Sequence, residues 1–184
     1  MTTTTATVVP TGTWNIDPAH SSVEFQVKHL GIATVKGHFN QFEGALEVGP
    51  DGIPTTARGS VKVETVDTRE EQRDAHLRSP DFFDAENHPE LTFVATAIEP
   101  VDEETFKVTG DLTIHGVTRE ETFDAELQGV EQDPWGNERF AVEVVGQIKR
   151  SDFGMTFNQA LGSGNMLVSD KVKINLDISA VKAA

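Results

Sequence analysis

Cysteine and tyrosine are both absent from the 184 residues of the chain. Without cysteine, the protein has no disulfide, no thiolate nucleophile and no cysteine-bound zinc or iron–sulfur cluster. Apolar runs are short, and none approaches the roughly 18 residues that a membrane-spanning helix needs. Residues 1–10 contain neither a basic region nor an apolar stretch. They therefore predict no secretory signal and, by default, a cytoplasmic protein.

Cations are scarce as well. The chain has 15 Lys and Arg against 30 Asp and Glu, which gives a formal net charge of −15 at pH 7. Nucleic acids are bound through Lys and Arg, so this balance argues against a nucleic-acid partner. Anionic membranes would repel the bulk of such a protein. The charge otherwise predicts only good solubility.

Compact catalytic and metal motifs are also missing. There is no Gly-x-Ser-x-Gly elbow, the glycine-rich residues 161–165 do not continue as a phosphate-binding loop, and the six histidines show no HExxH spacing. We expect the histidines to lie apart, at strand ends and turns, and Asp81 and Asp84 to be solvated loop carboxylates. The sequence therefore predicts no catalytic residue, no metal and no cofactor.

Alternation of apolar and polar residues is the dominant pattern. Residues 22–28, 106–114 and 172–178 each place apolar side chains on one face and polar side chains on the other, as half-buried strands do. Turn residues separate such segments, as in 49–52 and 134–137. Residues 68–78 differ, since they are rich in helix formers and begin with Thr68 and Glu71 in the spacing of a capping box.

These patterns predict an all-β fold, a closed antiparallel β-barrel of about eight strands with one or two short helices. Residues 1–11 are threonine-rich and lack periodicity, so we expect a flexible tail followed by a single domain at 12–184. A barrel of this size holds either packed side chains or one small ligand.

Several large apolar residues fall in predicted loops, where exposure would be costly. Either they plug the ends of the barrel or they line the way into a cavity. They are Phe42, Phe82, Phe83, Phe153, Met155, Phe157, Leu161 and Met166.

Five separate segments carry a resemblance to a known family. They are HSSVEFQVKH at 20–29, RDAHLRSPDFFD at 73–84, GDLTIHGVT at 110–118, SDFG at 151–154 and SDKVKI at 169–174. Together they resemble the YceI-like family in the order of its motifs. The similarity extends from about Trp14 to Lys182, almost the whole chain.

This resemblance implies a lipocalin-like barrel that binds a polyisoprenoid lipid or an isoprenoid quinone in a long apolar tunnel, for transport or storage. Members of the family are often dimers, so a homodimer is possible. The loop residues above would form the mouth of the tunnel, and further apolar residues would line it. Those lining candidates are Phe25, Val27, Phe39, Leu46, Val61, Val63, Phe93, Leu112, Phe123, Phe140 and Val142.

For each of these residues, core packing explains the position as well as ligand contact does, because both roles use the inner face of a barrel. A polar headgroup would need a donor near the mouth, and His29, Lys36 and Arg78 are the candidates. Two alternatives stay open. One is an enzyme, such as a metal-assisted hydrolase or isomerase, which requires at least three histidines or carboxylates converging in the cavity. The other is an interaction module with a packed barrel.

Overall fold

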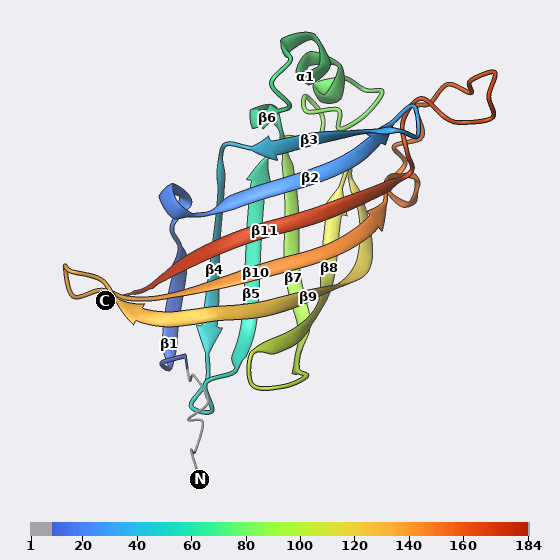
Figure 1. Cartoon of the computed structure of the whole chain (residues 1–184). Helices are drawn as coiled ribbons and strands as arrows, with labels where there is room; N and C mark the ends of the chain where they lie inside the picture. Colours follow the sequence, from blue (N-terminus) through green and yellow to red (C-terminus); the bar gives the residue numbers. More distant parts are fainter. Residues whose placement is uncertain (1–8, 184) are drawn as a thin grey trace.

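The computed structural model describes residues 9–183, which form one antiparallel β-sheet and a single α-helix (Figure 1). None of the helices in this range is long and apolar enough to cross a membrane. The strands are β1 (Gly12–Ile16), β2 (Ser22–His29), β3 (Ala33–Phe39), β4 (Phe42–Val48), β5 (Pro54–Lys62), β6 (Val66–Asp67), β7 (Glu90–Pro100), β8 (Thr105–Ile114), β9 (Val117–Gln132), β10 (Glu138–Lys149) and β11 (Lys171–Lys182). The helices are α1 (Glu71–Arg78) and the 3-10 turns η1 (Pro18–His20), η2 (Val63–Thr65) and η3 (Arg150–Phe153).

The sheet closes on itself because β11 pairs with β10 on one edge and with β1 and β2 on the other. The pairs β1/β2, β3/β4 and β5/β6 each follow one another directly and pair with the same neighbours, so each behaves as one interrupted strand. Counted this way, the barrel has eight antiparallel strands. This confirms the predicted lipocalin-like closed barrel with one short α-helix.

Alternation places the core inside the barrel. Along β9, Phe123, Ala125 and Leu127 are buried, while Asp124 and Glu126 between them are exposed. Two glycines make room for inward aromatic rings, since a Cβ on Gly37 would collide with Phe25 and one on Gly146 would collide with Phe123. The apolar side chains on these strands therefore point into the barrel, as the period-two pattern predicted.

The helix begins later than its predicted cap. Glu70 is the N-cap and accepts the backbone N–H groups of Gln72 and Arg73 at 3.3 and 2.6 Å. Thr68, the predicted cap, is instead buried, and its N–H donates to Asp74 at 2.8 Å. Arg69 between them has a left-handed φ of 68°, which breaks the helical path. The capping box at Thr68 and Glu71 is thus wrong, while the helix itself is present.

The N-terminal boundary of the barrel also lies earlier than predicted. Val9 is only 5% exposed and packs with Trp14 in one end of the core. The Trp14 indole Nε1 donates to Pro10 O at 3.0 Å, and Thr11 Oγ1 donates to Gly49 O at 3.0 Å. Residues 9–11 therefore belong to the domain rather than to a flexible tail. The rest of the predicted tail, residues 1–8, lies outside the described residues.

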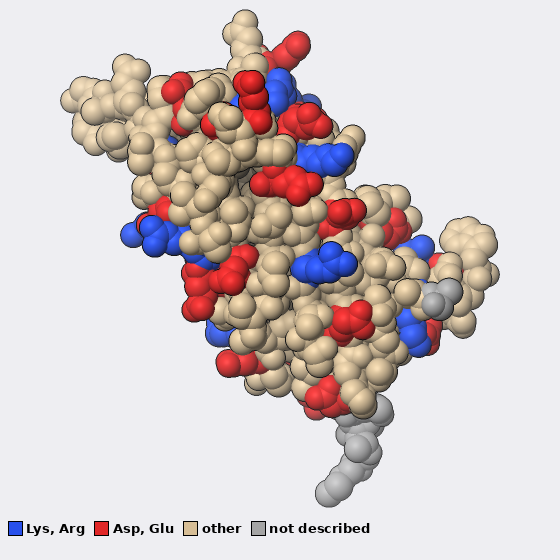
Figure 2. Space-filling view, turned by 180° about the vertical axis from the view of Figure 1, so that it is seen from behind, with Lys and Arg blue, Asp and Glu red and all other residues tan. Residues whose placement is uncertain are grey.

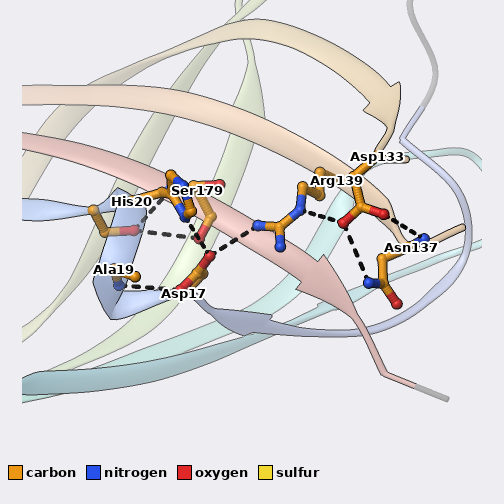
Figure 3. A network of polar contacts seen from close by, with 8 residues as sticks. Asp17, Ala19, His20, Asp133, Asn137, Arg139 and Ser179 are labelled. Atoms are coloured by element: carbon orange, nitrogen blue, oxygen red, sulfur yellow. Dashed lines mark hydrogen bonds and ion pairs between the residues drawn. The ribbon is translucent and has the colours of Figure 1, made fainter. Parts of the chain in front are cut away.

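A charged clasp joins η1 to the β9–β10 turn beside the β1–β11 seam (Figure 3). The Arg139 guanidinium donates to Asp17 Oδ2 and to Asp133 Oδ2, both at 2.8 Å. His20 Nδ1 also lies 2.8 Å from Asp17 Oδ2. The hydrogen bond from Arg139 lowers the pKa of Asp17 to about 2, and the same cause lowers the pKa of Asp133 to about 2.

Candidate functional site

The barrel contains a cavity of about 250 Å³. Its wall is built mainly from inward apolar side chains of β2, β4, β5 and β7–β11, with Val9 and Ile16 from the N-terminal segment. One core cluster, around Trp14 and Phe140, closes the end beside the β1–β11 seam. Two others, around Phe153 and Phe39, occupy the opposite end. The cavity thus lies between two plugs of packed side chains.

Many of the predicted lining residues form this wall. They come from seven strands and face inward by the alternation seen in the sequence. They are Phe25, Phe42, Leu46, Val61, Phe93, Leu112, Phe123, Phe140 and Val142. Phe42, expected at the mouth, therefore lies in the wall.

Three predicted wall residues lie elsewhere. Val63 is in η2, because the strand alternation stops at Lys62. Phe39 is buried against Val61 and Val66 at one end of the barrel, outside the cavity wall. Val27 lies towards the end of β2 and borders an outer hollow with Lys28 and Thr34 instead of the cavity. These positions correct the predicted lining.

The loop residues mostly act as a plug. Phe153 is fully buried, Met155 is 5% exposed, and both pack against the barrel core. Phe83 contacts Phe25 and Phe39, with ring centroids 6.4 and 5.7 Å apart. None of these three residues lines the cavity. Of the two possibilities that the sequence left open, the structure shows the plug.

The remaining loop candidates lie above this plug. Phe82 and Phe157 form an outer aromatic layer, with centroids 5.3 Å apart and His76 against both rings. Leu161 and Met166 lie further out on the loop before β11, and Met166 is 44% exposed. Neither borders the cavity, so they do not form a mouth in this conformation.

Arg150 organises the plug and was not identified from the sequence. It is 4% exposed, and its guanidinium donates to the carbonyl oxygens of Ser169 (2.9 Å), Met155 (2.8 Å) and Val168 (3.2 Å). Burial lowers the pKa of this guanidinium. Its hydrogen bonds fix the backbone on both sides of the loop, so that Met155 stays over the barrel. An Arg after an alternating strand looks like any solvated cation in sequence, which is why it was missed.

The predicted headgroup donors do not reach the cavity. His29 and Lys36 are exposed, on the last residue of β2 and on β3, and Arg78 ends α1. The polar residues at the edge of the cavity are Glu24, Glu43, Arg58 and Ser60, but the wall itself is almost wholly apolar. They lie on β2, β4 and β5, around the interruptions between β1 and β2 and between β3 and β4.

Two histidines that were expected to lie apart come together with a carboxylate. Asp84, His88 and His115 each offer a ligand atom, and these atoms lie within 4.8 Å of one another. The prediction that the histidines are separate and that Asp84 is merely solvated is therefore wrong. None of the three borders the cavity, so they do not supply the convergence in the cavity that the enzyme alternative requires.

Comparison with known proteins identifies the family. Residues 14–180 match the YceI-like domain. A UPF0312 protein of Staphylococcus aureus (strain MSSA476) is 41% identical over 162 residues, which cover 87% of this chain and 92% of that protein. The crystal structure of the Campylobacter jejuni YCEI protein is 33% identical, with a TM-score of 0.75 over 85% of this chain and 90% of that one. Burkholderia cenocepacia BcnA is 26% identical, with a TM-score of 0.75 over 89% and 98%. This chain therefore belongs to the YceI-like family.

Proposed function

We propose that the protein binds a long-chain apolar lipid, a polyisoprenoid or an isoprenoid quinone, inside its barrel for transport or storage, and that it is a carrier rather than an enzyme. The observation that carries this proposal is the internal cavity with its almost wholly apolar wall. A structural neighbour supports the ligand class, since its structure is described as a polyisoprenoid binding domain from Saccharophagus degradans. That domain is 16% identical to this chain, with a TM-score of 0.71.

A prenyl chain suits such a wall because it has no hydrogen-bonding groups to satisfy. Each buried methylene contributes about 0.8 kcal/mol before ordering costs. The cavity of about 250 Å³ is slightly smaller than the roughly 300–1,000 Å³ typical of ligand pockets. A long chain would therefore extend past the cavity by displacing a plug, and the loop that carries Phe83 is the candidate for this movement.

The first experiment is mass spectrometry of an organic extract of the purified protein, followed by titration with quinones of increasing prenyl length. We expect a stoichiometric prenyl lipid in the extract, or affinity that rises with chain length. A folded protein that yields no lipid and binds none of the quinones would disprove the carrier function.

A matched pair of variants tests the location of the ligand. Val142 lines the cavity, whereas Val145 on the same strand is 38% exposed. Val142→Phe puts a phenyl ring in place of two methyl groups inside the cavity and should weaken lipid binding at least tenfold. Val145→Phe makes the same chemical change outside and should bind as the wild type does. Equal binding by both variants would place the lipid outside the barrel.

A further inference from the structure

The histidine and carboxylate group at the loop end of the barrel has the composition of a metal site. Asp84 and His88 lie in the segment between α1 and β7, and His115 lies in the β8–β9 turn. All three are partly buried, and their ligand atoms lie within 4.8 Å of one another. We propose that Asp84, His88 and His115 bind a divalent transition-metal ion, with Zn²⁺ as the best match to two imidazoles and one carboxylate.

The backbone already holds two of the ligands in unusual conformations. Asp84 has φ 53° and His115 has φ 55°, both in the left-handed region that non-glycine residues seldom adopt. The N–H of His88 donates to Asp84 O at 2.8 Å, so a hydrogen-bonded turn brings these two residues together. Such conformations persist only where the surroundings enforce them.

Hydrogen bonds from neighbouring groups orient the ligands as they do in metalloproteins. Asn87 Nδ2 lies 3.2 and 2.9 Å from the two carboxylate oxygens of Asp84. His115 Nδ1 lies 3.2 Å from Phe153 O, a carbonyl that can only accept. A proton on Nδ1 would leave the Nε2 lone pair of His115 available for a metal, the arrangement common among metal-bound histidines.

The three ligand atoms need to approach one another only slightly to reach the spacing of a zinc site. Bonds of about 2.0–2.2 Å in a tetrahedral site put ligand atoms about 3.4 Å apart. The rings of His88 and His115 are 5.2 Å apart at 65°, and Gly116 lies directly beneath His88, where a Cβ would collide with the ring. Water would supply the fourth ligand on the exposed side. Such an ion would connect the loop carrying Phe83 to the β8–β9 turn, and this connection does not depend on lipid binding.

The test is calorimetric titration of the metal-free protein with Zn²⁺, together with thermal unfolding in zinc and in chelator. We expect one ion per chain, a higher unfolding midpoint with zinc, and at least tenfold weaker binding by His88→Gln and by Asp84→Asn. His38→Gln is the matched control, because His38 lies 3.6 Å from Asp67 and, among residues 9–183, belongs to no group of three possible ligands.

The control should bind zinc as the wild type does. The proposal is overturned if the folded wild type binds no zinc, or if His88→Gln binds as tightly as the wild type. It is also overturned if His38→Gln loses as much affinity as His88→Gln, because the binding would then be a general property of surface histidines.

A separate observation concerns lysines on the outer face of four adjacent strands. β10, β11, β2 and β3 lie side by side in the sheet, across the front of Figure 1. Their exposed lysines are Lys28, Lys36, Lys149, Lys171 and Lys173. Lys149 lies directly opposite Lys171, while Lys36 and Lys173 flank Gln26. In the part of the chain that the structure describes, lysine ion pairs form at Lys107 and Lys182, not at this face.

This lysine face contrasts with the rest of an acidic protein. Figure 2 shows the side turned away in Figure 1, where acidic side chains are spread widely over the surface. Like charges directly opposite on neighbouring strands are unfavourable, and near Lys149 and Lys171 the carboxylate of Asp170 offsets part of this repulsion. We propose that the lysine face docks on an anionic phospholipid membrane, an inference that rests on the proposed lipid carriage. The acidic opposite side would then orient the protein on the membrane.

Sedimentation with vesicles tests this docking apart from lipid uptake. The wild type should bind vesicles of phosphatidylcholine with phosphatidylglycerol, but not vesicles of phosphatidylcholine alone, and binding should fall as salt rises. Lys171→Glu should bind at least threefold more weakly. Lys62→Glu on β5 makes the same charge change away from this face and should bind normally.

Absence of wild-type binding to the anionic vesicles, or an equal loss in both variants, overturns the docking proposal. Quinone binding measured in detergent, without vesicles, reports on the carrier function separately. A protein that binds quinone but no vesicle would therefore retain the carrier function and lose only the docking.

Discussion

The two ends of the barrel are closed in different ways. The seam end, where Trp14–Ile16 of β1 pairs with Ala180–Lys182 of β11, combines a short ladder with a buried indole and a charged clasp around Arg139. The loop end is covered by α1 and by two loops whose aromatic side chains press down on the strands. Residues of the barrel wall itself close the seam end, whereas α1 and the two loops close the loop end. A ligand would therefore enter and leave at the loop end, where closure can be reversed without opening the barrel.

Loss of Trp14 should have the largest effect, because it weakens the seam itself. Trp14 is fully buried and packs edge-on to Phe140 at 4.8 Å. We expect Trp14→Ala to lower the free energy of unfolding by about 3–5 kcal/mol, measured by urea unfolding. Trp135→Ala is the control, since Trp135 is 81% exposed and its loss should cost less than about 0.5 kcal/mol. Similar costs for both variants would show that Trp14 does not hold the seam.

Loss of Phe83 should act mainly on the loop end. Phe83 contacts Phe25 and Phe39 but is only partly buried. We expect Phe83→Ala to cost about 2 kcal/mol and to speed the exchange of a bound quinone, followed by fluorescence or stopped flow. Phe157→Ala, in the outer aromatic layer, should leave the exchange rate unchanged. An unaltered exchange rate in Phe83→Ala would contradict the plug as the gate.

The cap of α1 should have a smaller and local effect. Glu70 accepts two backbone N–H groups at the start of the helix. Glu70→Ala should therefore cost about 1 kcal/mol in urea unfolding, with faster hydrogen exchange confined to α1. The exposed Glu71, one residue later, gives the control variant Glu71→Ala. If both substitutions cost the same, the loss reflects helix charge rather than capping.

The clasp should contribute the smallest effect, and only above acidic pH. The pKa of Asp17 and that of Asp133 are both about 2, below the roughly 3.9 of an unfolded aspartate. Their stabilising contribution is therefore complete above about pH 4 and is lost as the pH falls from 4 towards 2. Urea unfolding across this range should show a steeper loss for the wild type than for Asp17→Asn. Identical slopes would show that the clasp does not stabilise the seam.

Much of the barrel could be predicted because its signal is local. Alternation along β9, β10 and β11 gives the strand, its inner face and its inward residues within a few positions. It fails where the chain leaves the strand, and so Val63 in η2 was assigned to the wall. It also fails where two competing local partners exist, since Thr68 satisfies Asp74 rather than capping the helix.

The groups that tertiary structure brings together could not be predicted. His115 is 27 positions from His88, and only the β7–β8 hairpin returns the chain to it. The role of Arg150 could not be predicted for the same reason. Its carbonyl partners include Val168 and Ser169, which follow a long loop. The number of residues between two positions does not show whether they meet in space until the strand register is known.

The short seam also places the two ends of the domain next to each other. Ala183 N–H donates to Thr13 O at 2.8 Å, so the first and last strands are hydrogen-bonded neighbours. Chains with adjacent ends tolerate circular permutation. The exposed residues 162–165, in the loop before β11, would provide new ends far from the seam. A permuted protein opened there and joined at the seam would turn the three-residue pairing of β1 with β11 into a hairpin with a covalent turn, and the loop before β11 would carry both new ends.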